Sequence, residues 1–183
     1  MRKLIIGAVT AAALLGAPAA AGAATAAPPR WTPVTDPLGS GHRDGSITLP
    51  AATFCAFDVK VAVVANGELQ NVTTLPDGTT VTKIMGPLVL SFTNKTHPRK
   101  TIVKDVSGST TTAVSPNGSN VTQQGDGANW FAIGPGGRMN TGEPALVFTY
   151  GPVTLTVTVA NGVGTVQTFS LHGTQQNGCA LLS

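Results

Sequence analysis

The chain has 183 residues, enough for one domain of ordinary size. It carries 11 Lys and Arg residues against 8 Asp and Glu residues, so neither charge is in large excess. A nucleic-acid-binding protein needs a strongly basic face, and this composition therefore predicts no nucleic-acid partner.

Residues 1–26 predict a secretory signal peptide. Arg2 and Lys3 precede an Ala-rich apolar run that ends in small residues, with cleavage expected after Ala23 or Ala26. The apolar run is shorter than the ~20 residues of a membrane-spanning helix. We therefore expect a bacterial protein that is secreted to the extracellular side, with no transmembrane segment in its mature form. Removal of Arg2 and Lys3 leaves 9 of the 11 basic residues against the same 8 acidic ones.

Residues 27–52 predict an N-terminal arm that is partly disordered. Pro, Gly and charged residues are frequent there, and such segments at a chain end are poorly ordered unless a contact holds them. Trp31 or the apolar residues of 47–49 would supply that contact.

From residue 53 onward, β-forming runs alternate with turn residues. Residues 57–63 and 153–159 have an apolar residue at every second position, which is typical of strands, and no segment has helical periodicity. The predicted strands are 53–64, 68–74, 79–84, 87–93, 100–106, 109–114, 119–124, 129–133, 145–150, 153–159 and 163–172.

Two similar phrases, LPDGTT at 75–80 and SPNGSN at 115–120, predict hairpin turns. Pro presets φ at an early turn position, Asp or Asn tolerates left-handed backbone, and Gly adopts positive φ without steric cost. The residues that flank the two segments are not similar to each other, so we interpret the segments as one turn type used twice and not as a sequence repeat. Asn66–Gly67 and Asn161–Gly162 are further hairpin signals.

Cys55 and Cys179 are the two cysteines of the chain, and an even count in an exported protein predicts one disulfide. Free thiols and a two-cysteine metal site are the alternatives. A disulfide requires Cα atoms about 4.4–6.8 Å apart, which would bring the first and last strands together. We therefore expect residues 53–183 to form one all-β domain: an antiparallel meander of about 8–11 strands closed into a β-barrel or a tight β-sandwich.

No catalytic or cofactor-binding motif of a known type is present: there is no GxSxG, HExxH, P-loop, GxGxxG or EF-hand pattern. His42, His97 and His172 are isolated and have no metal-ligand spacing. The sequence thus predicts no cofactor and no metal site, and it identifies no catalytic residue.

The stretch 95–104 concentrates positive charge in Lys95, Arg99, Lys100 and Lys104. A solvated hairpin tip accounts for such a short cluster. The functional alternative is an anchor for an anionic surface polymer or lipid head groups. Trp130, Phe131, Phe148 and Tyr150 are expected in the core.

If the strands enclose an interior, its lining is apolar. The predicted inward residues are Phe57, Val59, Val61, Val63, Val153, Leu155, Val157 and Val159. A core filled by side chains is the default, and a small apolar ligand is the alternative. The irregular segment 134–144 would then cover the opening, with Arg138 and Glu143 as the candidate ligand contacts.

The chain resembles an uncharacterised family of small secreted actinobacterial all-β proteins with paired terminal cysteines. The signal sequence, FCAFDVKV, LPDGTT, GPLVLSFTN and the closing NGCALLS carry this resemblance. It implies export and an all-β domain, and it brings no catalytic residue with it. Two hypotheses follow: a non-enzymatic exported domain that binds a small apolar ligand or a cell-surface polymer, or a small secreted enzyme, a hydrolase or barrel isomerase, with its site at one end of the domain.

Overall fold

The computed structural model describes residues 30–39, 41, 45–134, 145–160 and 163–183. Within these residues the chain is all-β and its strand pairs are antiparallel, as the sequence predicts. The elements are β1 (Thr32–Pro33), β2 (Ser46–Leu49), β3 (Val59–Asn66), β4 (Leu69–Thr74), β5 (Thr80–Met85), β6 (Leu88–Asn94), β7 (Thr101–Asp105), β8 (Ser109–Val114), β9 (Asn120–Asp126), β10 (Ala128–Ala132), β11 (Leu146–Tyr150), β12 (Val153–Ala160), β13 (Val163–Leu171), β14 (Thr174–Asn177) and the short helix α2 (Gly178–Leu182).

The eleven predicted strands correspond in order to β3 through β13, with most ends within two residues. The largest difference is at the first strand, because residues 51–57 form turns and bends before β3 begins at Val59. Four short elements were not predicted: β1, β2, β14 and α2. The strands β1 and β2 lie in the predicted arm, where their few residues give too short a pattern to distinguish from a loop.

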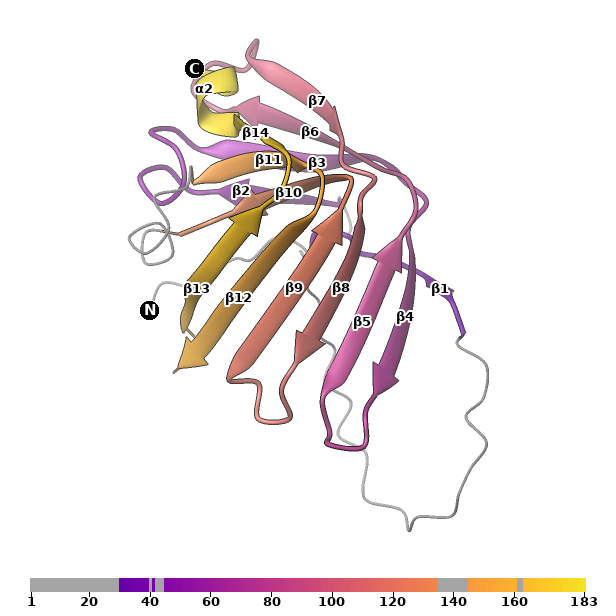
Figure 1. The fold of residues 1–183 in the computed structure, drawn as a ribbon. Helices are drawn as coiled ribbons and strands as arrows, with labels where there is room; N and C mark the ends of the chain where they lie inside the picture. Colours follow the sequence, from indigo (N-terminus) through magenta and orange to yellow (C-terminus); the bar gives the residue numbers. More distant parts are fainter. Residues whose placement is uncertain (1–29, 40, 42–44, 135–144, 161–162) are drawn as a thin grey trace.

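The described strands pair into three sheets (Figure 1). One has four strands in the order β2-β3-β6-β7, one has three in the order β10-β11-β14, and one has seven in the order β1-β4-β5-β8-β9-β12-β13. In the described part of the chain none of these sheets closes on itself. The arrangement is therefore sandwich-like.

In the three-stranded sheet, β10 and β11 are buried on both faces, whereas the edge strand β14 is exposed. Trp130 and Phe148 belong to a core shared with the four-stranded sheet, where the Phe92 ring meets them edge-on at centroid distances of 5.5 and 4.8 Å. Phe131 and Val147, on the opposite face, belong to a second core shared with β12 and β13. Layers of β structure with apolar residues on every contacting face pack in this way because each face must be removed from water.

Two separate cores replace the single interior expected from the sequence. Val59 and Val61 are fully buried in the first core, and Val153, Leu155 and Val157 are buried in the second. The two sets therefore do not line one common space. Both are packed against aromatic and aliphatic side chains, as the default of a filled core requires.

The prediction of a meander is correct within hairpins and wrong between them. The chain completes a hairpin in one sheet and then crosses to another, so that β3 pairs with β6, β5 with β8 and β9 with β12. Asn66–Gly67 is one of these crossings and not a hairpin turn. Asn161–Gly162 lies outside the described residues, but the pairing of Ala160 with Val163 shows the expected hairpin.

Crossings from different sheets contact each other closely through glycines. A Cβ atom at Gly108 would collide with the carbonyl oxygens of Ala128 and Asp126. Only a residue without a side chain allows the backbones to approach this closely. The Gly residues between β runs therefore mark changes of sheet as well as hairpin turns.

The two repeated phrases form matching turns, as predicted. The Asp77 carboxylate accepts a hydrogen bond from the backbone N–H of Thr79 at 2.9 Å, and Asn117 does the same for Ser119 at 3.1 Å. Gly78 and Gly118 have positive φ of 84° and 69°. Because β5 pairs with β8, the β4–β5 and β8–β9 turns are neighbours at one end of the large sheet (Figure 1). One turn type used twice thus serves two adjacent hairpins.

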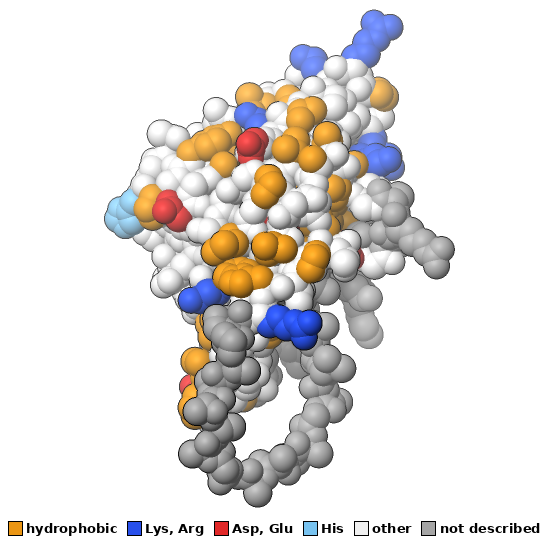
Figure 2. All heavy atoms as spheres, turned by 90° about the vertical axis from the view of Figure 1, so that its right-hand side faces the viewer, with side chains coloured by type: hydrophobic (Ala, Val, Ile, Leu, Met, Phe, Trp, Pro, Cys, Tyr) orange, Lys and Arg blue, Asp and Glu red, His pale blue; other side chains and the backbone are white. Residues whose placement is uncertain are grey.

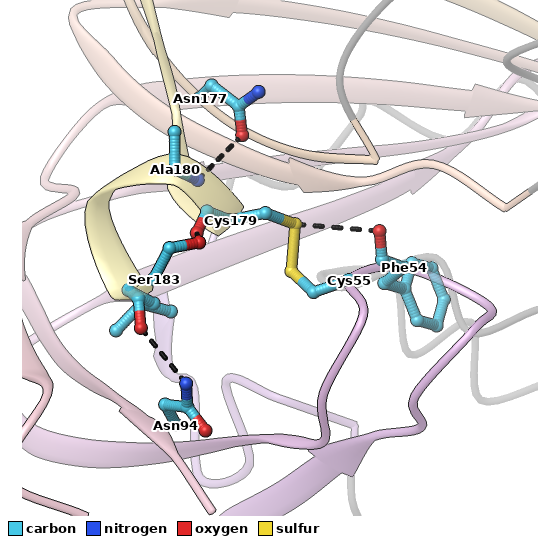
Figure 3. The surroundings of a disulfide bond; sticks show 8 residues. Phe54, Cys55, Asn94, Asn177, Cys179, Ala180 and Ser183 are labelled. Carbon is cyan, nitrogen blue, oxygen red and sulfur yellow. Dashed lines mark hydrogen bonds between the residues drawn. A yellow bond between two sulfur atoms is a disulfide. The ribbon is translucent and has the colours of Figure 1, made fainter. Parts of the chain in front are cut away.

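Cys55 and Cys179 form the predicted disulfide, with a Cα–Cα distance of 5.5 Å (Figure 3). It joins the turn before β3 to α2, whose first turn is capped by the Asn177 side chain accepting from the Ala180 N–H. The buried Asn94 side chain donates to the carbonyl oxygen of Leu182 at 3.0 Å. The C-terminus is thereby fastened to the end of β6. The part of the chain that the structure describes contains no helix with the length and hydrophobicity of a membrane span.

Candidate functional site

The seven-stranded sheet is wider than the three-stranded sheet that covers it, and its composition changes where the cover ends. On the inner face, the β12 residues Val153, Leu155 and Val157 are apolar and buried beneath the three-stranded sheet. By strand register the same face continues through Gln123 of β9 and Thr112 of β8 towards β5 and β4. Polar side chains thus line the portion of the sheet that no apolar layer covers.

A largely enclosed cavity of about 50 Å³ lies over this polar portion, and we call it the Glu68 cavity. Its floor is the sheet face, formed by Gln70, Thr82, Ile84, Thr110, Thr112 and Gln123. Its walls are Leu88, Val106, Asn129 and Trp130 on one side and Val34, Asp36 and Pro37 of the arm on the other. Glu68, immediately before β4, completes the lining.

Four polar side chains of the lining are more than nine-tenths buried: Glu68 with 9% exposed, Thr112 with 3%, Gln123 with 4% and Asn129 with 6%. Asn129 donates to the Asp126 carbonyl oxygen at 3.2 Å. Glu68, Thr112 and Gln123 have no side-chain hydrogen bond to another residue of the described part of the chain. Buried polar groups in folded proteins are nearly always hydrogen-bonded to protein, water or a ligand. Water or a ligand inside the cavity can supply hydrogen-bond partners to these three side chains.

Burial raises the pKa of Glu68 from 4.5 to about 7. The physical cause is desolvation, which disfavours the carboxylate relative to the neutral acid. Near neutral pH this side chain therefore exists in both protonation states. A carboxyl group with such a pKa can accept or donate a hydrogen bond, and such shifts are common at functional sites.

The N-terminal arm forms a fixed wall of the site. The Val34 N–H donates to the Glu68 carbonyl oxygen at 3.0 Å, and the Asn66 side-chain amide donates to the Val34 carbonyl oxygen at 2.6 Å. The other side-chain atom of Asn66, Oδ1, accepts from the Glu68 N–H at 2.9 Å. Leu38, 3% exposed, anchors the arm in the first core. Asn66 thus joins the arm to the backbone of Glu68.

The candidate ligand contacts Arg138 and Glu143 lie outside the described residues. Of the basic stretch 95–104, Lys95 approaches the exposed Asp58 carboxylate at 4.0 Å. Lys104 donates to Gln176 at 2.8 Å and lies 5.3 Å from the Phe148 ring centroid, so it is engaged within the fold. Lys104 therefore contacts other parts of the fold, whereas residues 95–100 are exposed to solvent.

A second hollow, of about 380 Å³, lies beside the disulfide. It is more open than the Glu68 cavity and is lined mainly by small or apolar residues, among them Ala56, Ala145 and Phe54, together with Asn177. No titratable side chain faces it from the described residues that form it. It therefore offers few groups that would orient a ligand.

Apolar side chains are also exposed along the side of the molecule that presents β1 and β4 (Figure 2). Leu69 of β4 and Met85 of β5, 40% and 46% exposed, are direct cross-strand partners. They lie on the outer face of the large sheet, opposite the Glu68 cavity. This surface is therefore separate from the candidate site.

The Glu68 cavity was not predicted from the sequence. Its polar residues come from six places in the chain, and each looks like an ordinary strand or turn residue. One signal was available: Thr or Gln stands on both faces of β8 and β9, where a strand packed on a core would have an apolar face. This pattern indicates a sheet region without an apolar cover.

No protein-family model, curated protein or solved structure matches this chain.

Proposed function

We propose that this chain is a non-enzymatic β-sandwich binding domain that accepts a small polar group in the Glu68 cavity. The observation that supports it most directly is the convergence of Glu68, Thr112 and Gln123, all buried and without side-chain partners among the described residues. Orientation of a ligand by a few well-placed polar groups beside an apolar wall is typical of binding sites. Here Trp130 and Leu88 supply that wall.

The size of the cavity favours part of a molecule over a whole one. A cavity needs about 10–15 Å³ to hold a single water molecule. The Glu68 cavity, with about 50 Å³, therefore accommodates a group of only a few non-hydrogen atoms. A terminal or side group of a cell-surface polymer fits this space. The polar lining favours such a group over the small apolar ligand that the sequence analysis considered.

We place this function outside the cytoplasm. A disulfide forms and persists in oxidising compartments, and the bond between Cys55 and Cys179 is consistent with an extracellular or periplasmic protein. The signal peptide predicted for residues 1–26 supports export, although those residues lie outside the described part of the chain. Mass spectrometry of the exported protein should find a chain that begins at Ala24 or Ala27.

NMR spectroscopy tests the binding function. The ¹H–¹⁵N spectrum of the mature protein would be followed during addition of small neutral, cationic and anionic polar molecules. At least one class should shift the amide signals of Thr112 and Gln123 and the indole signal of Trp130. Thr112→Val removes a hydroxyl from the cavity at nearly constant volume and should weaken that response.

Thr111→Val is the matched control. Thr111 is the next residue of β8 and faces the opposite side of the sheet, so the same chemical change there should leave the response intact. If no class of molecule shifts signals of the cavity residues, or if the two variants respond alike, the cavity is not a binding site.

A small secreted hydrolase is the second candidate, and one observation favours it. Glu68, with a pKa near 7, has the property of a general acid or base at neutral pH, and the cavity holds a second carboxyl group in Asp36. Glycoside hydrolysis uses two such carboxyl groups. Turnover of a chromogenic glycoside that is lost in Glu68→Gln would support the enzyme, and its absence supports the binding domain.

A further inference from the structure

The ionisable groups of the Glu68 cavity are both acidic. Glu68 faces it from the crossing before β4, and Asp36 faces it from the arm. Among the described lining residues, β5, β6, β8, β9 and β10 contribute no ionisable side chain, and none of these lining residues is Lys, Arg or His. An anionic ligand would meet like charges in this space.

The two carboxyl groups differ in their hydrogen-bond partners. Asp36 accepts a hydrogen bond from the Gly41 N–H at 2.8 Å. Glu68 is 9% exposed and has neither an ion pair nor a side-chain hydrogen bond to the described residues. A buried carboxylate without a partner is unfavourable, and a ligand that brings a positive charge removes this penalty.

The remaining lining groups suit a cation that donates hydrogen bonds. The hydroxyl oxygens of Thr82 and Thr112 and the amide oxygen of Gln123 are acceptors. Trp130 lines one wall beside these acceptors. A metal ion is less suited, because the described residues bring no three His, Cys, Asp or Glu side chains together.

We propose that the Glu68 cavity binds a protonated primary amine, either a small free amine or the charged end of a longer molecule. This inference rests on the proposed binding function and specifies the ligand class. The ammonium group donates to the Glu68 carboxylate and to the neighbouring hydroxyl and amide oxygens, and its carbon atoms contact Trp130 and Leu88. A few non-hydrogen atoms fill the available space of about 50 Å³.

Binding of this kind depends on pH. The amine is fully protonated below pH 9, whereas Glu68 must lose its proton to act as the counter-ion. Because burial raises the pKa of Glu68 to about 7, protonation competes with the ligand below that pH. The affinity should therefore fall by roughly a factor of 100 between pH 8 and pH 5.

The test uses three probes of similar size: ethylammonium, neutral ethanol and acetate. Each is titrated into the mature protein at pH 8 and at pH 5 while the amide signals of Glu68, Thr112 and Gln123 and the Trp130 indole signal are followed. Ethylammonium should bind at least tenfold more tightly than ethanol at pH 8. Acetate should not shift these signals.

Two variants with the same change in net charge distinguish binding of ethylammonium in the cavity from its general attraction to surface carboxylates. Glu68→Gln keeps the size of the side chain, removes the charge, and should abolish the preference for ethylammonium over ethanol. Asp105→Asn removes an exposed carboxylate outside the cavity and should leave that preference unchanged.

The possible outcomes separate this inference from the proposed function. Equal binding of ethylammonium and ethanol, insensitive to Glu68→Gln, would overturn the amine and leave a binding cavity for neutral groups. Binding of acetate alone would overturn the amine as well. If none of the probes, and no molecule of the wider panel, shifts the cavity signals, both proposals fail.

Discussion

Single residues in this protein illustrate how burial changes the behaviour of polar groups. Glu68 and Thr149 are both buried, and neither side chain has a hydrogen-bond partner among the described residues. Glu68 borders a cavity, where a ligand or water supplies a partner. Thr149 is fully buried in β11, and its hydroxyl oxygen faces packed protein. The first group can therefore gain a partner, and the second is a cost to stability.

Replacement of Glu68 should change how the free energy of unfolding depends on pH. The folded-state pKa of about 7 lies above the ordinary value of 4.5, so the folded protein holds this proton more tightly than the unfolded chain. The resulting stability is fully present below about pH 4.5 and is lost as pH rises to 7, by on the order of 3 kcal/mol. Urea unfolding at pH 4.5, 6 and 8 should show this loss in the wild type and not in Glu68→Gln.

The other carboxyl groups with shifted pKa values do not obscure this window. Hydrogen bonds from Thr79 and Ser107 lower the pKa values of Asp77 and Asp105 below 3.8, so both remain ionised above pH 4.5. Parallel pH profiles of wild type and Glu68→Gln would show that the carboxyl group is solvated or paired in solution.

Thr149→Val should stabilise the protein. Valine has nearly the same shape as threonine and lacks the hydroxyl that is buried without a partner, so the free energy of unfolding should rise by about 1–2 kcal/mol. Urea unfolding at pH 7 measures the change. Thr156→Val, on the outer face of β12, serves as the control and should change stability by less than about 0.5 kcal/mol. A loss of stability in Thr149→Val would mean that the hydroxyl has a partner in solution.

At the scale of elements, strand patterns reflect the number of faces that are covered. In β12 apolar residues alternate with polar ones, because one face of the strand meets a core and the other meets solvent. In β10 and β11 nearly every residue is buried, because a core lies on each face of the central sheet. In β8 and β9 polar residues stand on both faces, and the inner face borders the Glu68 cavity. The three patterns correspond to three environments.

Asn66 connects two elements of the site, and its removal should loosen the arm. Asn66→Ala loses the bonds to the Val34 carbonyl oxygen and the Glu68 N–H, which should cost about 1–3 kcal/mol. Water then reaches Glu68 more easily, and its pKa should fall towards 4.5. A ¹³C NMR titration of the glutamate side chains measures the pKa.

Asn117→Ala provides the matched comparison for this variant. Asn117 also bonds backbone and side-chain groups, but it lies in the β8–β9 turn, away from the arm. It should lower stability without changing the pKa of Glu68. If Asn66→Ala leaves that pKa near 7, the arm is not the wall that keeps water out.

At the scale of the molecule, the disulfide joins segments 124 residues apart and fastens the C-terminal helix to the turn before β3. Chain entropy in the unfolded state makes such a long-range bond stabilising. From the sequence we expected this disulfide to close a meander on itself. In the structure it instead links the four-stranded sheet to the element that follows β14, and the three sheets stay open at their edges.

Loss of the disulfide should therefore lower the free energy of unfolding by about 2–5 kcal/mol. The double variant Cys55→Ala, Cys179→Ala and the reduced wild type should agree with each other in urea unfolding. Asn94→Ala removes the hydrogen bond to the Leu182 carbonyl oxygen and keeps the disulfide. This variant therefore distinguishes the contribution of the hydrogen bond to stability from that of the disulfide. Equal unfolding midpoints with and without reductant would contradict a stabilising role.

The sequence by itself determined the local structure of this protein. The positions of β3 to β13, the two matching turns and the pairing of Cys55 with Cys179 were predicted, because they depend on side-chain alternation, on residues that adopt turn conformations, and on cysteine chemistry. These properties act over a few residues or, for the disulfide, follow from there being only two cysteines.

Only the tertiary structure decided which sheet each hairpin joins and where the candidate site lies. Turn residues such as Asn66–Gly67 occur both at hairpins and at crossings between sheets, because both require a tight backbone turn. Whether the next strand pairs in the same sheet or in another depends on which apolar faces pack together. The Glu68 cavity exists because a seven-stranded sheet extends beyond a three-stranded one, and this difference in width is a property of the assembled layers. The burial that raises the pKa of Glu68 arises only when the arm, the sheet and Trp130 come together around it.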